Sequence, residues 1–236
     1  MTNTLDHTQS GYSRVADDAP RQPRGRAWAL TGAVAGVAGA IGIIASMSID
    51  AVYSPSSQGD PASIVTRLGE LTTNMLVFHT AMMVATVLLI VFAAGLRHRL
   101  STSSAPGSLL PDVAAGGLML TAVAGLMGTG LNTEFIFAVA DPGTALVPEA
   151  AVMYGHWVGT IPWLWVGSGI TGVALAFAGL RQGAVPLWLG WVGAVLGGLT
   201  LLFGLSPLQY MAGFTGPVLV AVVGLGFLFG DRVVRA

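Results

Sequence analysis

Six long apolar segments constrain the fold of this chain more than any other feature of its sequence. They cover residues 27–49, 73–96, 112–131, 151–180, 185–205 and 208–230. Each holds about 20 residues or more, and about 20 helical residues cross a hydrocarbon core of roughly 30 Å. The segments are continuously apolar rather than alternating, which favours helices over the strands of a membrane barrel. The sequence therefore predicts an all-α polytopic membrane protein with six transmembrane helices.

The basic residues predict how these helices are oriented. All ten are arginines, and nine of them precede the first segment or follow the second, fourth and sixth: Arg14, Arg21, Arg24, Arg26, Arg97, Arg99, Arg181, Arg232 and Arg235. The tenth, Arg67, follows the first segment. Lys and Arg near the ends of membrane helices stay cytoplasmic. We therefore expect both termini to be cytoplasmic and the loop that holds Arg67 to be outside.

The composition agrees with a lipid bilayer as the main partner. Hydrophobic residues make up 53% of the 236 and charged residues 9%, against about 25% charged residues in soluble domains. Basic residues form no cluster suited to nucleic acid, and the run of arginines at 21–26 is most simply a topology signal that also attracts anionic lipid headgroups. An arginine-, alanine- and glycine-rich chain without lysine is typical of GC-rich bacteria, so we expect a bacterial plasma membrane.

Two residue types are missing altogether, and their absence excludes some chemistry. The chain has no cysteine and no lysine. Disulfides, thiolate metal sites and thiol redox reactions are excluded, and so are mechanisms that use a lysine nucleophile or a lysine Schiff base. The absence of cysteine leaves the redox compartment undetermined.

The polar ends of the chain define its domain organisation. Residues 1–26 are polar and contain Pro20 and Pro23, so we expect a disordered cytoplasmic tail. The apolar stretch that follows is longer than the 7–15 residues of a signal-peptide core, which favours a retained helix. Residues 27–231 form the predicted six-helix transmembrane domain, and 232–236 a cytoplasmic C-terminus. No segment is long enough for a separate soluble domain.

Loops and helix-breaking residues add local detail. We expect a short helix around 64–71 in the first outer loop, with Arg67 and Glu70 as a solvated i, i+3 pair. Pro162 and Pro217 lie within the fourth and sixth spans, where each removes a backbone hydrogen bond and favours a kink. The Thr160 hydroxyl is placed to satisfy part of the backbone freed at Pro162. Many of the 33 glycines lie within spans, which favours close helix packing in the bundle or, alternatively, a homo-oligomer or a larger membrane complex.

Two histidines are the strongest candidates for chemistry. His79 lies about six residues, or roughly 9 Å, below the outer end of the second span, and His156 lies about five residues into the fourth. Asp50 and Glu134 stand at outer helix ends nearby. Two imidazoles at similar depth with carboxylates close by are typical of a metal site or a haem-ligating pair. The alternative is that each imidazole is neutral and hydrogen-bonded to a neighbouring helix, while Asp50 and Glu134 are solvated.

These observations leave two function classes open. No Asp, Glu or Arg lies near the middle of a span, which disfavours a pump or a proton-coupled transporter. The leading hypothesis is a non-enzymatic accessory subunit or a small-molecule binding or transport component; transport would need a cavity between the kinked fourth and sixth spans. The alternative is an intramembrane metal- or haem-dependent enzyme with its site in the outer leaflet, which requires His79 and His156 to face one cavity.

The stretch from residue 155 to residue 207 resembles a known family. Gly155 and His156 open a span, Gly179–Leu180–Arg181 ends it, and Val185–Pro186–Leu187–Trp188–Leu189–Gly190–Trp191 forms a tight inside turn leading into the next helix. These features resemble a family of small bacterial integral membrane proteins known only as a domain of unknown function. The resemblance covers about a quarter of the chain and implies about six spans with no assigned activity.

Overall fold

The computed structural model describes residues 26–57, 59–141 and 146–230. Nine α-helices lie in this part of the chain: α1 Ala27–Met47, α2 Pro61–Glu70, α3 Thr72–Ser101, α4 Leu110–Ala140, α5 Pro148–Thr160, α6 Val166–Leu180, α7 Leu187–Val192, α8 Gly198–Gly204 and α9 Ala212–Leu225. Two 3₁₀ segments, η1 Ile161–Trp165 and η3 Gln209–Met211, and two π segments, η2 Gly193–Gly197 and η4 Gly226–Gly230, connect or extend them. Residues 1–25 of the tail predicted for 1–26, and the whole C-terminus predicted for 232–236, lie outside the described residues.

The six predicted membrane helices are confirmed. The described residues contain six helical spans that are long and apolar enough to cross a bilayer: Ala27–Met47, Thr72–Ser101, Leu110–Ala140, Pro148–Leu180, Leu187–Gly204 and Gln209–Gly230. The second and third are longer than predicted, because their helices continue through Ser101 and Ala140 into what we expected to be loops. Glu134, which we expected at the outer end of the third span, therefore lies within α4. The side of the membrane that each terminus faces stays a prediction.

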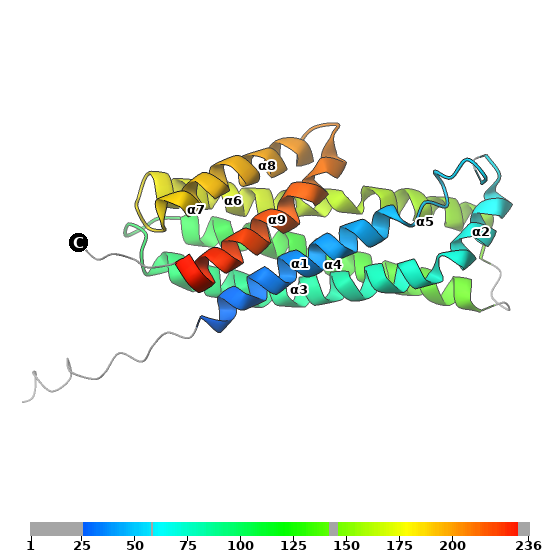
Figure 1. The fold of residues 1–236 in the computed structure, drawn as a ribbon, viewed down its shortest axis with the longest axis horizontal. Coiled ribbons are helices and arrows are strands. Elements are labelled where there is room, and N and C mark those ends of the chain that lie inside the picture. The colour runs from blue at the N-terminus through cyan, green and yellow to red at the C-terminus, as the bar shows by residue number, and fades with distance from the viewer. Residues whose placement is uncertain (1–25, 58, 142–145, 231–236) are drawn as a thin grey trace, which may run out of the picture.

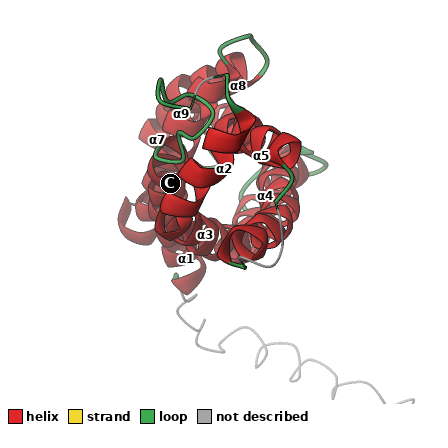
Figure 2. Cartoon of the chain, turned by 90° about the vertical axis from the view of Figure 1, so that its right-hand side faces the viewer, coloured by secondary structure: helices red, strands yellow, loops and turns green. Residues whose placement is uncertain are grey.

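The spans run along the long axis of an elongated bundle, with α2 at one end (Figure 1). The helix α1 packs between α3 and α9, α3 packs on α4, and α4 packs on α6. The helix α6 in turn lies against α7, α8 and α9. Figure 2 shows α2 lying across the end of the bundle, where it contacts α3, α4 and α5. We call this the α2 end, and we call the opposite end, which carries Arg26, Arg97, Arg99 and Arg181, the arginine end.

Glycine allows the helix backbones to pack closely in the centre of the bundle. A Cβ atom on Gly117 of α4 would overlap the carbonyl oxygen of Gly167 on α6, and one on Gly36 of α1 would overlap the backbone of α9. The predicted role of the span glycines in internal packing is thus visible in the structure. Backbones this close leave little room for an aqueous path along the bundle.

The two prolines within spans affect their helices differently. At Pro162 the α-helix gives way to the 3₁₀ segment η1, and the Ile161 amide donates to the Val158 carbonyl. The carbonyl of Trp157, which loses its usual i+4 donor, accepts the Thr160 hydroxyl at 2.8 Å, as we expected of that hydroxyl. At Pro217, in contrast, α9 continues without interruption.

A transport role would need a cavity between the fourth and sixth spans, but these spans pack tightly where Gly213 and Gly216 face Pro162 and Trp165. A Cβ atom on Gly213 of α9 would overlap the Pro162 ring, and one on Gly216 would lie 2.6 Å from Cβ of Trp165. Trp165 is fully buried, and its ring also fills the space beside Gly39 of α1. The pyrrolidine ring and the indole therefore fill the space on the side of the Pro162 break that faces α9 and α1.

Candidate functional site

A groove at the α2 end combines apolar walls with two phenols, and we call it the tyrosine groove. Its walls come from the end of α1, the loop that follows it, α5 and η3, and it is lined by Ser46, Met47, Ile49, Tyr53, Gly159 and Tyr210. Its volume is about 380 Å³, within the roughly 300–1,000 Å³ that is usual for small-molecule sites. Met47 is 60% exposed, so the groove opens sideways from the bundle.

Tyr53 is held in place by contacts with α5. Its ring lies edge-on to the His156 ring, with centroids 5.8 Å apart and an interplanar angle of 88°. A Cβ atom on Gly159 would lie 2.6 Å from the Tyr53 hydroxyl, so only glycine at this position lets the phenol lie against the helix. Burial, and then the neighbouring Tyr210, raise the pKa of Tyr53 above its usual value of 10.0. The phenol therefore stays neutral and able to donate at neutral pH.

The loop that carries Tyr53 is itself docked on the bundle. Val52 fills the space above Gly155, where a Cβ atom would overlap its side chain. Ala51 is buried, and its carbonyl accepts the Ser57 hydroxyl at 2.5 Å. Asp50 pairs with Arg67 of α2 at 3.3 Å. These contacts give the groove a preformed wall.

The polar groups of the groove are available to a ligand. Neither the Tyr53 hydroxyl nor the Tyr210 hydroxyl has a hydrogen-bond partner among the described residues, and both side chains are about half exposed. The Ser46 hydroxyl donates to the Ile43 carbonyl at 2.8 Å, so it retains only acceptor capacity. The groove therefore combines two hydroxyl donors, those of Tyr53 and Tyr210, with a surface formed by Met47, Ile49 and the Gly159 backbone.

The two histidines predicted as ligands face different surroundings. His79 lies at the helical spacing of Met75 and Met82, both buried, and its Nδ1 is buried without a hydrogen-bond partner in the described structure. His156 is exposed and lies against Tyr53. The structure therefore brings His156 to the edge of the tyrosine groove and leaves His79 on the packed face of α3.

A buried hydrogen-bond network separates these two positions. Asn132 of α4 donates to the Met75 carbonyl at 3.4 Å and accepts the Tyr154 hydroxyl at 2.5 Å, and both side chains are fully buried. Tyr154 and His156 are two residues apart on α5, so they point about 200° apart around the helix. Tyr154 faces α4 and the α3 backbone one turn from His79, and His156 faces the other way.

The two carboxylates predicted to assist also differ in their surroundings. Asp50 forms an ion pair with Arg67, and Arg67 also pairs with Glu70 at 2.8 Å. The predicted i, i+3 pair of Arg67 and Glu70 is therefore present, and Asp50 is a second acidic partner of the same arginine. Glu134 is exposed on α4 and lies about 200° around the helix from Asn132. Within the described chain, no group of three or more His, Asp or Glu side chains could hold a metal ion. A metal centre at Asp50, His79, Glu134 and His156 stays a prediction.

A second groove near the Pro162 break is larger but lacks a comparable polar pair. It lies between α4 and the α5–η1 junction, has a volume of about 530 Å³ and includes Met127, Leu131, Trp157, Thr160 and Trp163 in its lining. The Trp163 indole already donates to the Gly204 carbonyl at 3.0 Å, and the Thr160 hydroxyl to that of Trp157. The Trp163 indole and the Thr160 hydroxyl therefore already form hydrogen bonds within the fold. We call it the tryptophan groove.

Comparison with known proteins adds no further constraint on function. No family model, no curated protein and no solved structure matches this chain. The resemblance of residues 155–207 to an uncharacterised membrane family stays a prediction. The spans alone define the class, which is a multi-pass, all-helical membrane protein.

Proposed function

We propose that this protein is a non-enzymatic membrane component that binds an uncharged amphiphile in the tyrosine groove. The observation that carries the proposal is the pair of phenols, Tyr53 and Tyr210, without partners among the described residues, over an otherwise apolar lateral groove. With the topology that the arginines predict, this groove lies at the outer face of a bacterial plasma membrane.

The chemistry of the groove indicates the kind of ligand. Two neutral phenols donate hydrogen bonds, which suits a head group that carries carbonyl or ether oxygens. The walls formed by Met47 and Ile49 suit an apolar ring or tail, and the sideways opening lets such a molecule enter from the bilayer. No arginine lines the groove, so an anionic head group would find no counter-charge there.

The packing of the bundle favours binding over transport. Glycine-mediated contacts between α4 and α6 and between α1 and α9 close the interior, and Trp165 fills the space beside the Pro162 break. A ligand in the tyrosine groove would therefore meet packed helices on its inner side. This supports a binding or accessory role rather than a path across the membrane.

A quinone with a ten-carbon tail is a suitable probe, because it joins two carbonyl acceptors to an apolar body. We expect the purified protein in detergent to bind it, and Tyr53→Phe/Tyr210→Phe to bind it about tenfold more weakly or worse, since each lost hydrogen bond contributes about 1 kcal/mol. Trp163→Phe alters the tryptophan groove and removes the indole hydrogen bond to Gly204, but it leaves Tyr53 and Tyr210 in place and should bind as the wild type does. Equal affinity in the wild type and the double variant would remove the tyrosine groove as the site.

The metal or haem alternative has its own test. Elemental analysis and an absorption spectrum measure the metal and haem content of the purified wild-type protein and of the double variant His79→Ala/His156→Ala. Stoichiometric metal or a Soret band that disappears in the variant would favour the enzyme class. A wild-type protein without either would leave the binding role.

A further inference from the structure

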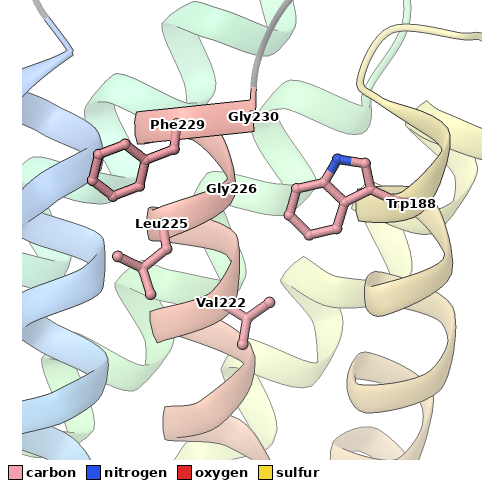
Figure 3. A pocket seen from close by; sticks show the side chains of 6 residues that line it. All are labelled: Trp188, Val222, Leu225, Gly226, Phe229 and Gly230. Atoms are coloured by element: carbon pink, nitrogen blue, oxygen red, sulfur yellow. The ribbon is translucent and has the colours of Figure 1, made fainter.

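A third groove lies at the arginine end, between the start of the fifth span and the end of the sixth (Figure 3). Trp188 of α7 forms one wall, and Val222, Leu225 and Phe229 of α9 and η4 form the other side. Its volume is about 300 Å³. Leu225 and Phe229 are 45% and 73% exposed, so the groove faces the surroundings of the bundle rather than its interior. We call it the Trp188 groove.

Two glycines make room for the indole in this groove. Gly226 and Gly230 are four residues apart on η4, and a Cβ atom on them would lie 2.7 Å from Cη2 and 3.0 Å from Cζ2 of Trp188, respectively. Side chains at these positions would displace the ring. The segment is also a π-helix, a form that is rare and often found at functional sites.

The Trp188 indole presents a donor at the mouth of the groove. In Figure 3 its nitrogen points toward the Gly230 end, away from Val222. The indole N–H makes no hydrogen bond to another described residue, and the side chain is 44% exposed. A tryptophan with an apolar body and a free N–H at a helix end is typical of the membrane interface, where ester carbonyls lie.

Positive charge gathers at the same end of η4. The Arg26 Nη1 donates to the Leu228 carbonyl at 3.0 Å, and the Arg99 guanidinium lies 6.0 Å from the Phe227 ring centroid. Two guanidinium groups therefore contact η4, the segment that carries Gly226, Phe229 and Gly230 of the groove.

We propose that the Trp188 groove holds an acyl chain of an anionic phospholipid from the leaflet at the arginine end. The acyl chain would lie along Val222, Leu225 and Phe229. The ester carbonyl would accept the Trp188 N–H, and the headgroup would lie on the side of Arg26 and Arg99. Charge complementarity selects an anionic lipid over a zwitterionic one, because each arginine near a membrane surface attracts anionic headgroups. This site is independent of the tyrosine groove at the opposite end of the bundle.

Native mass spectrometry of the full chain tests this proposal with phosphatidylglycerol and phosphatidylcholine of the same acyl composition. We expect the wild type to retain phosphatidylglycerol about fivefold better, the effect of about one arginine near the surface. Val222→Phe and Leu225→Trp fill the groove from its exposed side and should remove that preference. Val195→Phe places the same bulk on a half-exposed position of η2 outside the groove and should keep it.

Thermal unfolding separates loss of the site from loss of the fold. The filling variants should melt within a few degrees of Val195→Phe in the absence of added lipid. Equal retention of the two lipids by the wild type would overturn the proposal. So would an unchanged preference in both filling variants, or a lipid-free dimer that Val222→Phe dissociates, which would make the groove a contact between two copies.

Discussion

Gly116 and Gly117 are adjacent on α4 but have opposite surroundings. A Cβ atom on Gly116 would meet nothing within 4 Å, whereas one on Gly117 would overlap the Gly167 carbonyl and the Thr171 side chain of α6. The Thr171 hydroxyl also donates across this interface to the Ala114 carbonyl at 2.8 Å. Close approach of these two helices therefore depends on one of the two glycines and not on the other.

This contrast gives a prediction with a built-in control. Gly117→Ala should destabilise the protein by about 1–3 kcal/mol, because the nearest overlapping atom, the Gly167 carbonyl oxygen, belongs to backbone that cannot move aside. Gly116→Ala should be neutral or stabilising by up to about 1 kcal/mol, since alanine is the better helix former. Thermal unfolding of the two variants in the same detergent measures the difference. Equal midpoints would contradict the packing described for α4 and α6.

Single residues also show how far the sequence could predict the site. The depth of Tyr210 and His156 in the membrane could be predicted from the sequence, because the distance of a residue from the end of its span gives its depth. The rotation of a helix about its axis cannot be predicted in this way. It is this rotation that turns Tyr154 toward α4 and His156 toward Tyr53. Tyr53 was missed because it lies in a loop; the only signal was the pair Gly155 and Gly159, spaced for a bulky partner.

At the scale of elements, α2 depends on a titratable residue for its first turn. Asp60 accepts the Ser63 hydroxyl at 2.5 Å and the Ala62 amide at 3.1 Å, and Pro61 follows it at the first helical position. These hydrogen bonds, with that from Ser63 the largest, lower the pKa of Asp60 below its usual 3.8. Because the folded pKa is lowered, the contribution to stability is present above about pH 4 and is lost as the pH falls through the folded pKa.

Amide hydrogen exchange of residues 61–70 tests this dependence. Corrected for intrinsic rates, protection of α2 should fall as the pH is lowered from 5 toward 2. Asp60→Asn keeps an N-cap acceptor that does not titrate, so its α2 should lose less protection over the same range. An identical acid profile in the two proteins would show that Asp60 is not the group responsible.

The elements themselves were predictable to different degrees. Continuous hydrophobicity located all six spans, and the short helix near residues 64–71 is present as α2. The extra turns of α3 and α4 were not predicted, because polar residues beyond the bilayer core end an apolar pattern without ending a helix. The presence of a proline did not predict whether its helix would break, as at Pro162, or continue, as at Pro217. The outcome depends on how neighbouring groups satisfy the freed backbone.

At the scale of the whole molecule, the absence of cysteine makes the predicted orientation easy to test. Ser56→Cys places a thiol in the loop at the α2 end, and Ala105→Cys places one in the loop at the arginine end; both positions are exposed. A membrane-impermeant maleimide should label Ser56→Cys in intact cells and label Ala105→Cys only after lysis, because arginine-rich ends stay cytoplasmic. The reverse pattern would invert the topology and move the tyrosine groove to the cytoplasmic side.

The most direct measurement of the central claim is the affinity of the ten-carbon quinone probe for Gly159→Ala beside the wild type. The added methyl would lie 2.6 Å from the Tyr53 hydroxyl, so it must displace the phenol while leaving both tyrosines in the chain. We predict at least about tenfold weaker binding, or about 1.4 kcal/mol, with Gly116→Ala binding as the wild type does. Unchanged affinity in Gly159→Ala would contradict a ligand held by Tyr53 in this groove.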